Sequence, residues 1–145
     1  MLSAYFDASA LAKLYLDEPG ASLVRTIQAG HNVAMSRLSE VEVASALRRR
    51  HAGGDLSPAD CDRMLADWEL DRLQFSVVEL DATIAAAARR LLASQLLRAS
   101  DAVQLASALT HRRGLGKPTP FVCFDIRLAA AAMREGLQVI PEVKA

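Results

Sequence analysis

Five short apolar runs, separated by longer helical stretches, constrain the fold of this 145-residue chain more than any other feature. The runs cover about residues 2–6, 32–36, 75–80, 120–124 and 137–140. Strands that alternate with helices in this way favour a parallel sheet covered by helices. The chain also has no internal repeat and no linker, and its length suits one domain with a real core. We therefore predict a single α/β domain over residues 1–145.

The stretches between the runs predict seven helices, because their apolar spacing is helical and Gly or Pro residues end them. Two helix starts carry more specific signals. Ser57 is followed by Pro58, which suits the first helical position, and Ser39 stands three residues before Glu42, as in a capping box. The predicted helices cover residues 8–16, 21–29, 39–50, 58–72, 82–96, 101–113 and 126–135.

Four acids lie where an apolar run meets a helix start or a strand end: Asp7, Glu42, Asp101 and Asp125. The carboxyl ends of parallel strands share one edge of a sheet, where open α/β folds bind their ligands. Carboxylates crowded there repel one another, and a bound cation relieves that repulsion. Each acid taken singly is also explained by helix capping, and that alternative stays open. Asp81 precedes a helix as well, but nothing else links it to the site.

Composition indicates an ordinary folded protein, with 52% hydrophobic residues, 23% charged residues and a formal net charge of zero. No apolar stretch is long enough for a membrane span, and the N-terminus reaches Asp7 without a basic region typical of a signal peptide. We therefore expect a cytoplasmic protein with no membrane contact. Cys61 and Cys123 have no CxxC partner and are predicted to be free thiols.

The acids and their surroundings together resemble the PIN domain, and more narrowly the VapC-like ribonuclease toxins of type II toxin–antitoxin pairs. The similarity covers essentially the whole chain, although no single motif is specific. It is carried by Asp7-Ala8-Ser9, by residues 42–47, by residues 98–106 and by residues 121–137. The resemblance implies a three-layer α/β/α PIN-like fold with a central, mostly parallel sheet of four to five strands.

The resemblance also implies a metal-dependent endoribonuclease with Asp7, Glu42, Asp101 and Asp125 as the catalytic acids. Asp7, Asp101 and Asp125 would hold Mg²⁺ or Mn²⁺, because magnesium prefers a few oxygen ligands and keeps its waters. A carboxylate without direct metal contact, Glu42 or Asp101, would accept the proton of the attacking water.

Substrate contacts are expected from Ser9, which helps to position the site, and from Arg98 and Arg37, which would anchor flanking RNA phosphates. The implied partners are an RNA substrate, a small antitoxin protein and a second copy of the chain in a homodimer. Three positions depart from the family: Cys123 replaces a frequent Thr, Gln104 a frequent His, and Arg127 a frequent acid. The departures at Cys123 and Arg127 argue against a second metal.

Other functions remain open at this point. A non-catalytic PIN-like module that binds RNA or protein would carry the same residues. A magnesium-dependent phosphatase would use its first Asp as nucleophile, but it expects a second Asp where Ser9 stands. A receiver domain needs a lysine after a later strand, whereas Lys117 precedes its strand.

Overall fold

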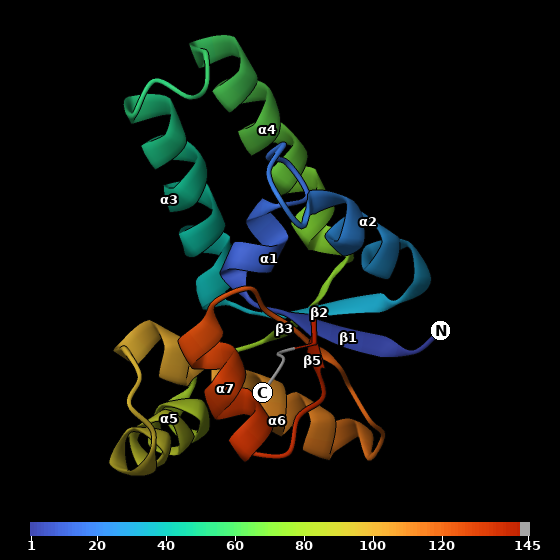
Figure 1. The fold of residues 1–145 in the computed structure, drawn as a ribbon, viewed down its shortest axis with the longest axis vertical. Coiled ribbons are helices and arrows are strands. Elements are labelled where there is room, and N and C mark those ends of the chain that lie inside the picture. The colour runs from blue at the N-terminus through green and yellow to red at the C-terminus, as the bar shows by residue number, and fades with distance from the viewer. Residues whose placement is uncertain (143–145) are drawn as a thin grey trace.

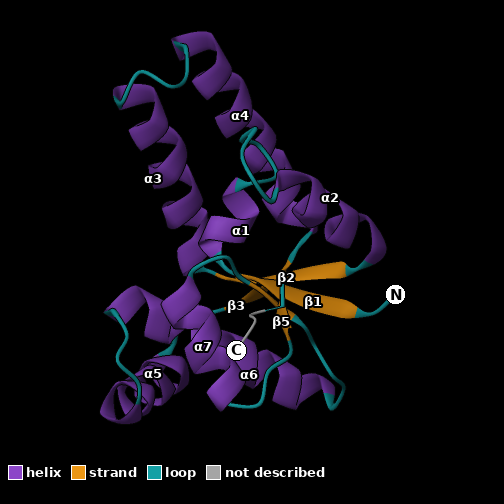
Figure 2. Ribbon diagram, viewed as in Figure 1, coloured by secondary structure: helices purple, strands orange, loops and turns teal. Residues whose placement is uncertain are grey.

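The computed structural model describes residues 1–142 as a five-stranded parallel sheet with helices on both faces (Figures 1 and 2). The predicted α/β/α architecture is therefore confirmed. Residues 143–145, the end of the predicted domain, lie outside the described residues. The strands are β1 (Ser3–Phe6), β2 (Asn32–Ser36), β3 (Ser76–Val78), β4 (Phe121–Val122) and β5 (Val139–Ile140).

Helices pack on the two faces as two groups, which Figure 1 shows above and below the sheet. The first group is α1 (Ala8–Ala12), α2 (Ala21–Gly30), α3 (Leu38–Ala52) and α4 (Pro58–Asp71). The second is α5 (Ala82–Ser94), α6 (Ala99–Leu115) and α7 (Ile126–Arg134). A short 3-10 helix, η1 (Arg72–Gln74), follows α4. The pair α3 and α4 extends away from the sheet (Figure 1).

The strands are apolar because both of their faces are covered. Side chains alternate between the two faces of a strand, so neighbouring residues of β1 enter different cores. Ala4 and Phe6 pack with the α1 to α4 group, whereas Tyr5 packs against α5 and α6. The Tyr5 ring meets Phe121 of β4 edge to face, with ring centroids 5.6 Å apart.

Strand order determines where a ligand site forms. The order is β3-β2-β1-β4-β5. The chain therefore adds β2 and β3 on one side of β1 and then β4 and β5 on the other side. Such a reversal leaves a crevice at the carboxyl ends of the two central strands. Asp7 directly follows β1, and its backbone N–H donates to the carbonyl of Val122 in β4 at 3.1 Å. Asp125 lies three residues beyond β4.

Several predicted boundaries are wrong. The helix expected over residues 8–16 ends at Ala12, because the N–H groups of residues 13 to 15 bond three residues back and tighten the chain into turns. The three later strands are shorter than predicted, and η1 was not predicted. Ser57 does cap α4, with Pro58 at its first position. Within residues 1–142, no helix is both long enough and apolar enough to cross a membrane.

Candidate active site

Asp7 occupies the end of β1 and is almost fully buried, with 4% of its surface exposed. Its Oδ1 accepts a hydrogen bond from the backbone N–H of Ala10 at 2.9 Å, so Asp7 is the N-cap of α1. The Ser9 hydroxyl donates to both carboxylate oxygens, at 2.8 and 2.9 Å. The predicted site residue Ser9 thus holds the Asp7 carboxylate, and capping and a site role coexist in one side chain.

Glu42 lies one turn into α3, but the capping box predicted for it is wrong. The helix starts earlier, at Leu38, whose N–H bonds the Ser36 hydroxyl. Ser39 is buried and accepts a hydrogen bond from Gln104 instead of capping the helix. Gln104 also donates to Glu42 Oε1 at 2.8 Å. Glu42 is therefore held from α6, on the opposite side of the sheet.

Asp101 and Asp125 reach the same region from the other helix layer. Asp101 is in the first turn of α6, where Arg98 is the N-cap residue and Ser100 lies inside the helix. Asp125 caps α7 by accepting from the N–H of Leu128 at 2.9 Å. Asp81, the acid left out of the site, only caps α5 through the N–H of Ile84.

One cavity of about 690 Å³ brings Glu42, Asp101 and Asp125 together. We call it the acid pocket. It has a basic rim, because Arg49, Arg98 and Arg127 line it as well. The remaining lining residues are Ser100, Phe124 and Ile126. A neighbouring hollow of about 360 Å³ shares Glu42 and Arg49 with the acid pocket and is completed by Ala8, Ser9, Val41, Ser45 and Ala46.

The basic rim differs from the sequence prediction. Both Arg98 and Arg37 were expected to anchor RNA phosphates. Arg98 lines the acid pocket, but Arg37 is not among the lining residues and forms ion pairs with Glu40 and Glu79. Arg49 was not predicted as a site residue, because a basic residue near the end of a predicted helix is also explained by the helix dipole. It treated Arg127 only as a departure from the family. Helical spacing was the available signal for Arg49, which lies seven residues, or two turns, after Glu42 on α3.

The acids form a chain of repulsions. Burial raises the pKa of Asp7 from 3.8 to about 6, against the hydrogen bonds from Ala10 and Ser9, and the charge of Glu42 adds to the rise. Burial and the charge of Asp101 raise the pKa of Glu42, while Gln104 and Arg49 oppose that rise. Burial and the charge of Asp125 raise the pKa of Asp101, against Arg98 and Arg127. The negative charges of Glu42, Asp101 and Asp125 thus each raise the pKa of a neighbouring acid.

The donor set fits a hard divalent cation in an open site. Among residues 1–142, no three His, Cys, Asp or Glu side chains lie close enough together to hold one metal ion by themselves. Magnesium does not require such a group, because it is usually held by one or two carboxylates, several waters and substrate phosphates. Carboxylates whose pKa is raised by burial and mutual repulsion are the groups that such a cation would stabilise.

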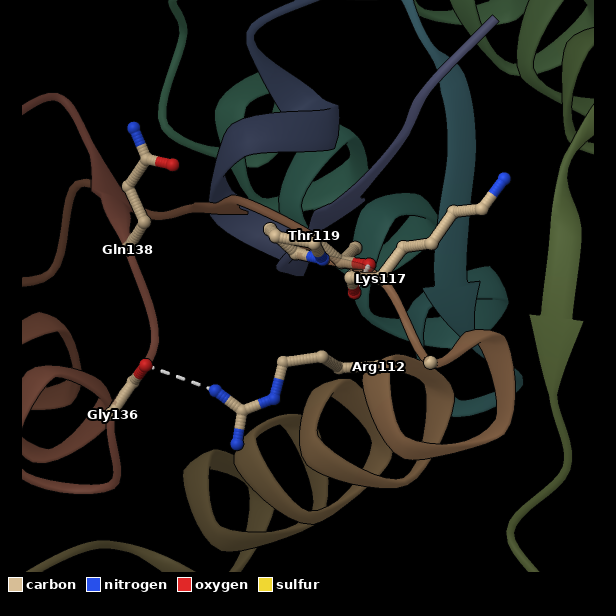
Figure 3. A pocket seen from close by; sticks show the side chains of 7 residues that line it. Arg112, Lys117, Thr119, Gly136 and Gln138 are labelled. Atoms are coloured by element: carbon tan, nitrogen blue, oxygen red, sulfur yellow. Dashed lines mark hydrogen bonds between the residues drawn. The ribbon is translucent and has the colours of Figure 1, made fainter.

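A separate cavity of about 420 Å³ lies at the opposite edge of the sheet (Figure 3). Its residues precede β4 and β5 or end α6, so it opens at the amino ends of the strands. Arg112 donates to the carbonyl of Gly136 at 2.9 Å across it. The lining residues are Arg112, Gly116, Lys117, Pro118, Thr119, Gly136 and Gln138, which include no acid. This cavity cannot supply the carboxylate chemistry of the acid pocket.

Comparison with known proteins identifies similar chains. The family model described as PIN domain matches residues 4–115. Ribonuclease VapC45 of Mycobacterium tuberculosis is 38% identical over 139 residues, which cover 94% of each chain. Two solved structures share the fold. VapC20 of M. tuberculosis, titled a sarcin-ricin loop cleaving toxin, has a TM-score of 0.66 at 19% identity over 88% of this chain and 94% of its own. A toxin–antitoxin complex from Klebsiella pneumoniae has a TM-score of 0.63 at 20% identity over 87% and 90%.

The raised pKa of Asp7 predicts that the metal-free protein is more stable in mild acid. The folded state binds this proton more tightly than the unfolded chain, so the contribution is complete below pH 3.8 and is lost as the pH rises through about 6. Asp7 alone should change the free energy of unfolding by on the order of 2 to 3 kcal/mol across this range. Denaturant unfolding in EDTA between pH 4 and 8 measures the slope.

Asp7→Asn should flatten this pH dependence, because Asn keeps the α1 cap without a titrating group. Asp81→Asn is the matched control and should leave the slope of the wild type unchanged. If Asp7→Asn and wild type have superimposable pH profiles, burial of Asp7 is not the source of the effect.

Proposed function

This chain belongs to the PIN domain family and, within it, to the VapC ribonucleases, and from this premise we propose that it is a metal-dependent endoribonuclease and the toxin of a toxin–antitoxin pair. One observation carries the proposal. Three separate elements, α3, α6 and the start of α7, bring acids to one pocket beside the buried Asp7, at the carboxyl ends of β1 and β4. Acids that line one cavity can act together on one bound phosphodiester, and this supports the proposal.

In the proposed reaction, a water attacks the scissile phosphorus, the bond from phosphorus to the leaving oxygen breaks, and the leaving oxygen takes a proton from solvent. Bound Mg²⁺ or Mn²⁺ would supply an acidified water and positive charge beside the phosphate. Asp7, Asp101 and Asp125 are assigned to that ion, which would be held partly through its own waters, because no three acids within residues 1–142 are grouped closely enough to bind it directly. Glu42 is assigned to accept the proton of the water, because its carboxylate lines the pocket and Gln104 holds only its Oε1.

The basic rim is assigned to the RNA backbone. A guanidinium binds phosphate through two parallel N–H groups, and Arg49, Arg98 and Arg127 flank the acids in the same cavity. We assign this role to Arg49 rather than to Arg37, because the guanidinium of Arg37 already forms ion pairs with Glu40 and Glu79. The acid pocket then repels phosphate at its centre and attracts it at its rim until a cation is bound.

The partner is proposed to be a small antitoxin that blocks the same pocket. The hollow beside it is lined mainly by small side chains from α1 and α3, which suits a packed apolar helix. An antitoxin arginine could reach the acids from there and compete with the metal through a charge-assisted contact. The similar K. pneumoniae structure is itself titled a toxin–antitoxin complex. A homodimer, which the family implies, and a cytoplasmic location, which was expected from the sequence, both remain predictions.

Asp7→Asn should abolish Mg²⁺-dependent RNA cleavage while the fold remains intact. The buried carboxylate loses its charge, whereas Asn retains the α1 cap. Asp81→Asn makes the same change in an exposed helix cap outside the site and should keep full activity. Cleavage of a labelled RNA is followed with Mg²⁺ and with EDTA, beside melting curves for each protein.

Two results would count against this function. Equal loss of activity in both variants at unchanged melting temperature would place the site elsewhere. Tight RNA binding without cleavage by the wild type, in either Mg²⁺ or Mn²⁺, would favour the non-catalytic binding module.

Arg49→Ala should weaken RNA binding and reduce its dependence on salt. Removing one phosphate contact to a single strand lowers the slope of log affinity against log salt by about 0.7. Arg48→Ala is the matched control, since Arg48 is the preceding, exposed residue of α3 and does not line the acid pocket. Binding is measured with catalytically inactive Asp7→Asn protein at several salt concentrations. Identical slopes for the two arginine variants would remove Arg49 from the substrate site.

A further inference from the structure

Gln104 is a buried amide next to the acid pocket, and 2% of its surface is exposed. It lies on α6, three residues after Asp101, and therefore on the same side of that helix. Its side chain makes hydrogen bonds to Tyr5, Ser39 and Glu42, at 2.7, 2.9 and 2.8 Å. A buried amide with this many partners is held in a single orientation.

The partners determine which end of the amide faces Glu42. An ionised carboxylate only accepts hydrogen bonds, so the group 2.8 Å from Glu42 Oε1 must be the amide Nε2. The second N–H of Nε2 donates to the Ser39 hydroxyl oxygen. Oε1 then faces β1, where it accepts from the Tyr5 hydroxyl. Within residues 1–142, no buried side-chain nitrogen or oxygen lacks a partner.

This one side chain joins the three segments that carry Asp7, Glu42 and Asp101. Tyr5 is on β1, two residues before Asp7, which directly follows that strand. Ser39 and Glu42 are in the first turns of α3, and Gln104 follows Asp101 on α6. Because α3 and α6 belong to the helix groups on opposite faces of the sheet, the amide also ties the two layers together at the edge where the site forms.

We infer that Gln104 is a positioning residue of the ribonuclease reaction, which orients the Glu42 carboxylate toward the acid pocket through its Nε2 while Tyr5 and Ser39 lock the amide. The inference rests on the proposed function. Gln104 itself does not line the acid pocket and is not expected to contact RNA. Its loss should therefore lower turnover and leave substrate affinity nearly unchanged, because only an interaction needed in the transition state is removed.

The direct test replaces the amide and keeps the volume. Gln104→Met has similar length but cannot donate a hydrogen bond to Glu42, and we expect kcat to fall by about 10- to 100-fold, which is part of what a positioned general base contributes. KM for RNA should stay within about threefold of wild type. Gln104→Glu is a second variant in case Met disturbs folding. It can still accept from Tyr5, but it places a carboxylate against Glu42 and should lose turnover to a similar extent.

Gln95→Met is the matched control for stability. Gln95 is also a buried glutamine, but its amide bonds Glu135 at 3.1 Å and Arg134 at 2.8 Å, away from the acid pocket. This variant loses buried hydrogen bonds without loosening an acid of the site, so its kcat should stay within about twofold of wild type. Melting temperatures of all variants are measured, and cleavage is assayed well below the lowest of them.

The outcomes separate this inference from the proposed function. Loss of kcat in both Gln104 variants, at near-constant KM and with an active Gln95→Met protein, supports the positioning role. Wild-type turnover in the Gln104 variants overturns it and leaves the ribonuclease proposal standing. A raised KM at constant kcat also overturns it, since Gln104 would then act in RNA binding. A wild-type protein that cleaves no RNA overturns the proposed function and this role together.

Discussion

The burial of one carboxylate, Asp7, is the physical constraint on which the candidate site depends. A buried charge is unfavourable unless hydrogen bonds or an opposite charge stabilise it. Here the backbone N–H of Ala10 and the Ser9 hydroxyl stabilise the charge only in part, because the pKa of Asp7 still rises to about 6. Glu42 adds to the rise rather than opposing it. Such an arrangement is unfavourable for stability alone and favourable for binding a cation.

The acids can be predicted from sequence because each lies at the boundary of a secondary-structure element. Asp7 and Asp125 follow the two strands that flank the reversal of strand order, and a parallel sheet brings such ends together. Asp101 is in the first turn of its helix in the prediction and in the structure. The order of strands and helices along the chain was predicted for the same reason, since short apolar runs and helical stretches alternate clearly.

Contacts between distant elements could not be predicted. Ser39 and Glu42 have the local spacing of a capping box, yet both bond to Gln104, 65 and 62 residues away. Arg37 was predicted to bind the substrate because of its charge. Its guanidinium instead forms an ion pair with Glu79, which follows β3 and lies 42 residues along the chain. Arg49 was left out of the predicted site because it lies in the last turn of α3, where a basic residue also complements the helix dipole. In each case tertiary packing selected one partner among several that local sequence allows.

The central claim is that a buried, partly protonated carboxylate belongs to a metal site, and proton release on Mg²⁺ binding tests it most directly. Isothermal titration calorimetry at pH 6 in buffers of different ionisation enthalpy measures that release. Because Asp7 has a pKa of about 6 and must ionise to hold a cation, binding should release roughly half a proton from this residue alone. Asp7→Asn should remove most of the release. Mg²⁺ binding with no proton released at pH 6, or with the same release in Asp7→Asn, would contradict the account.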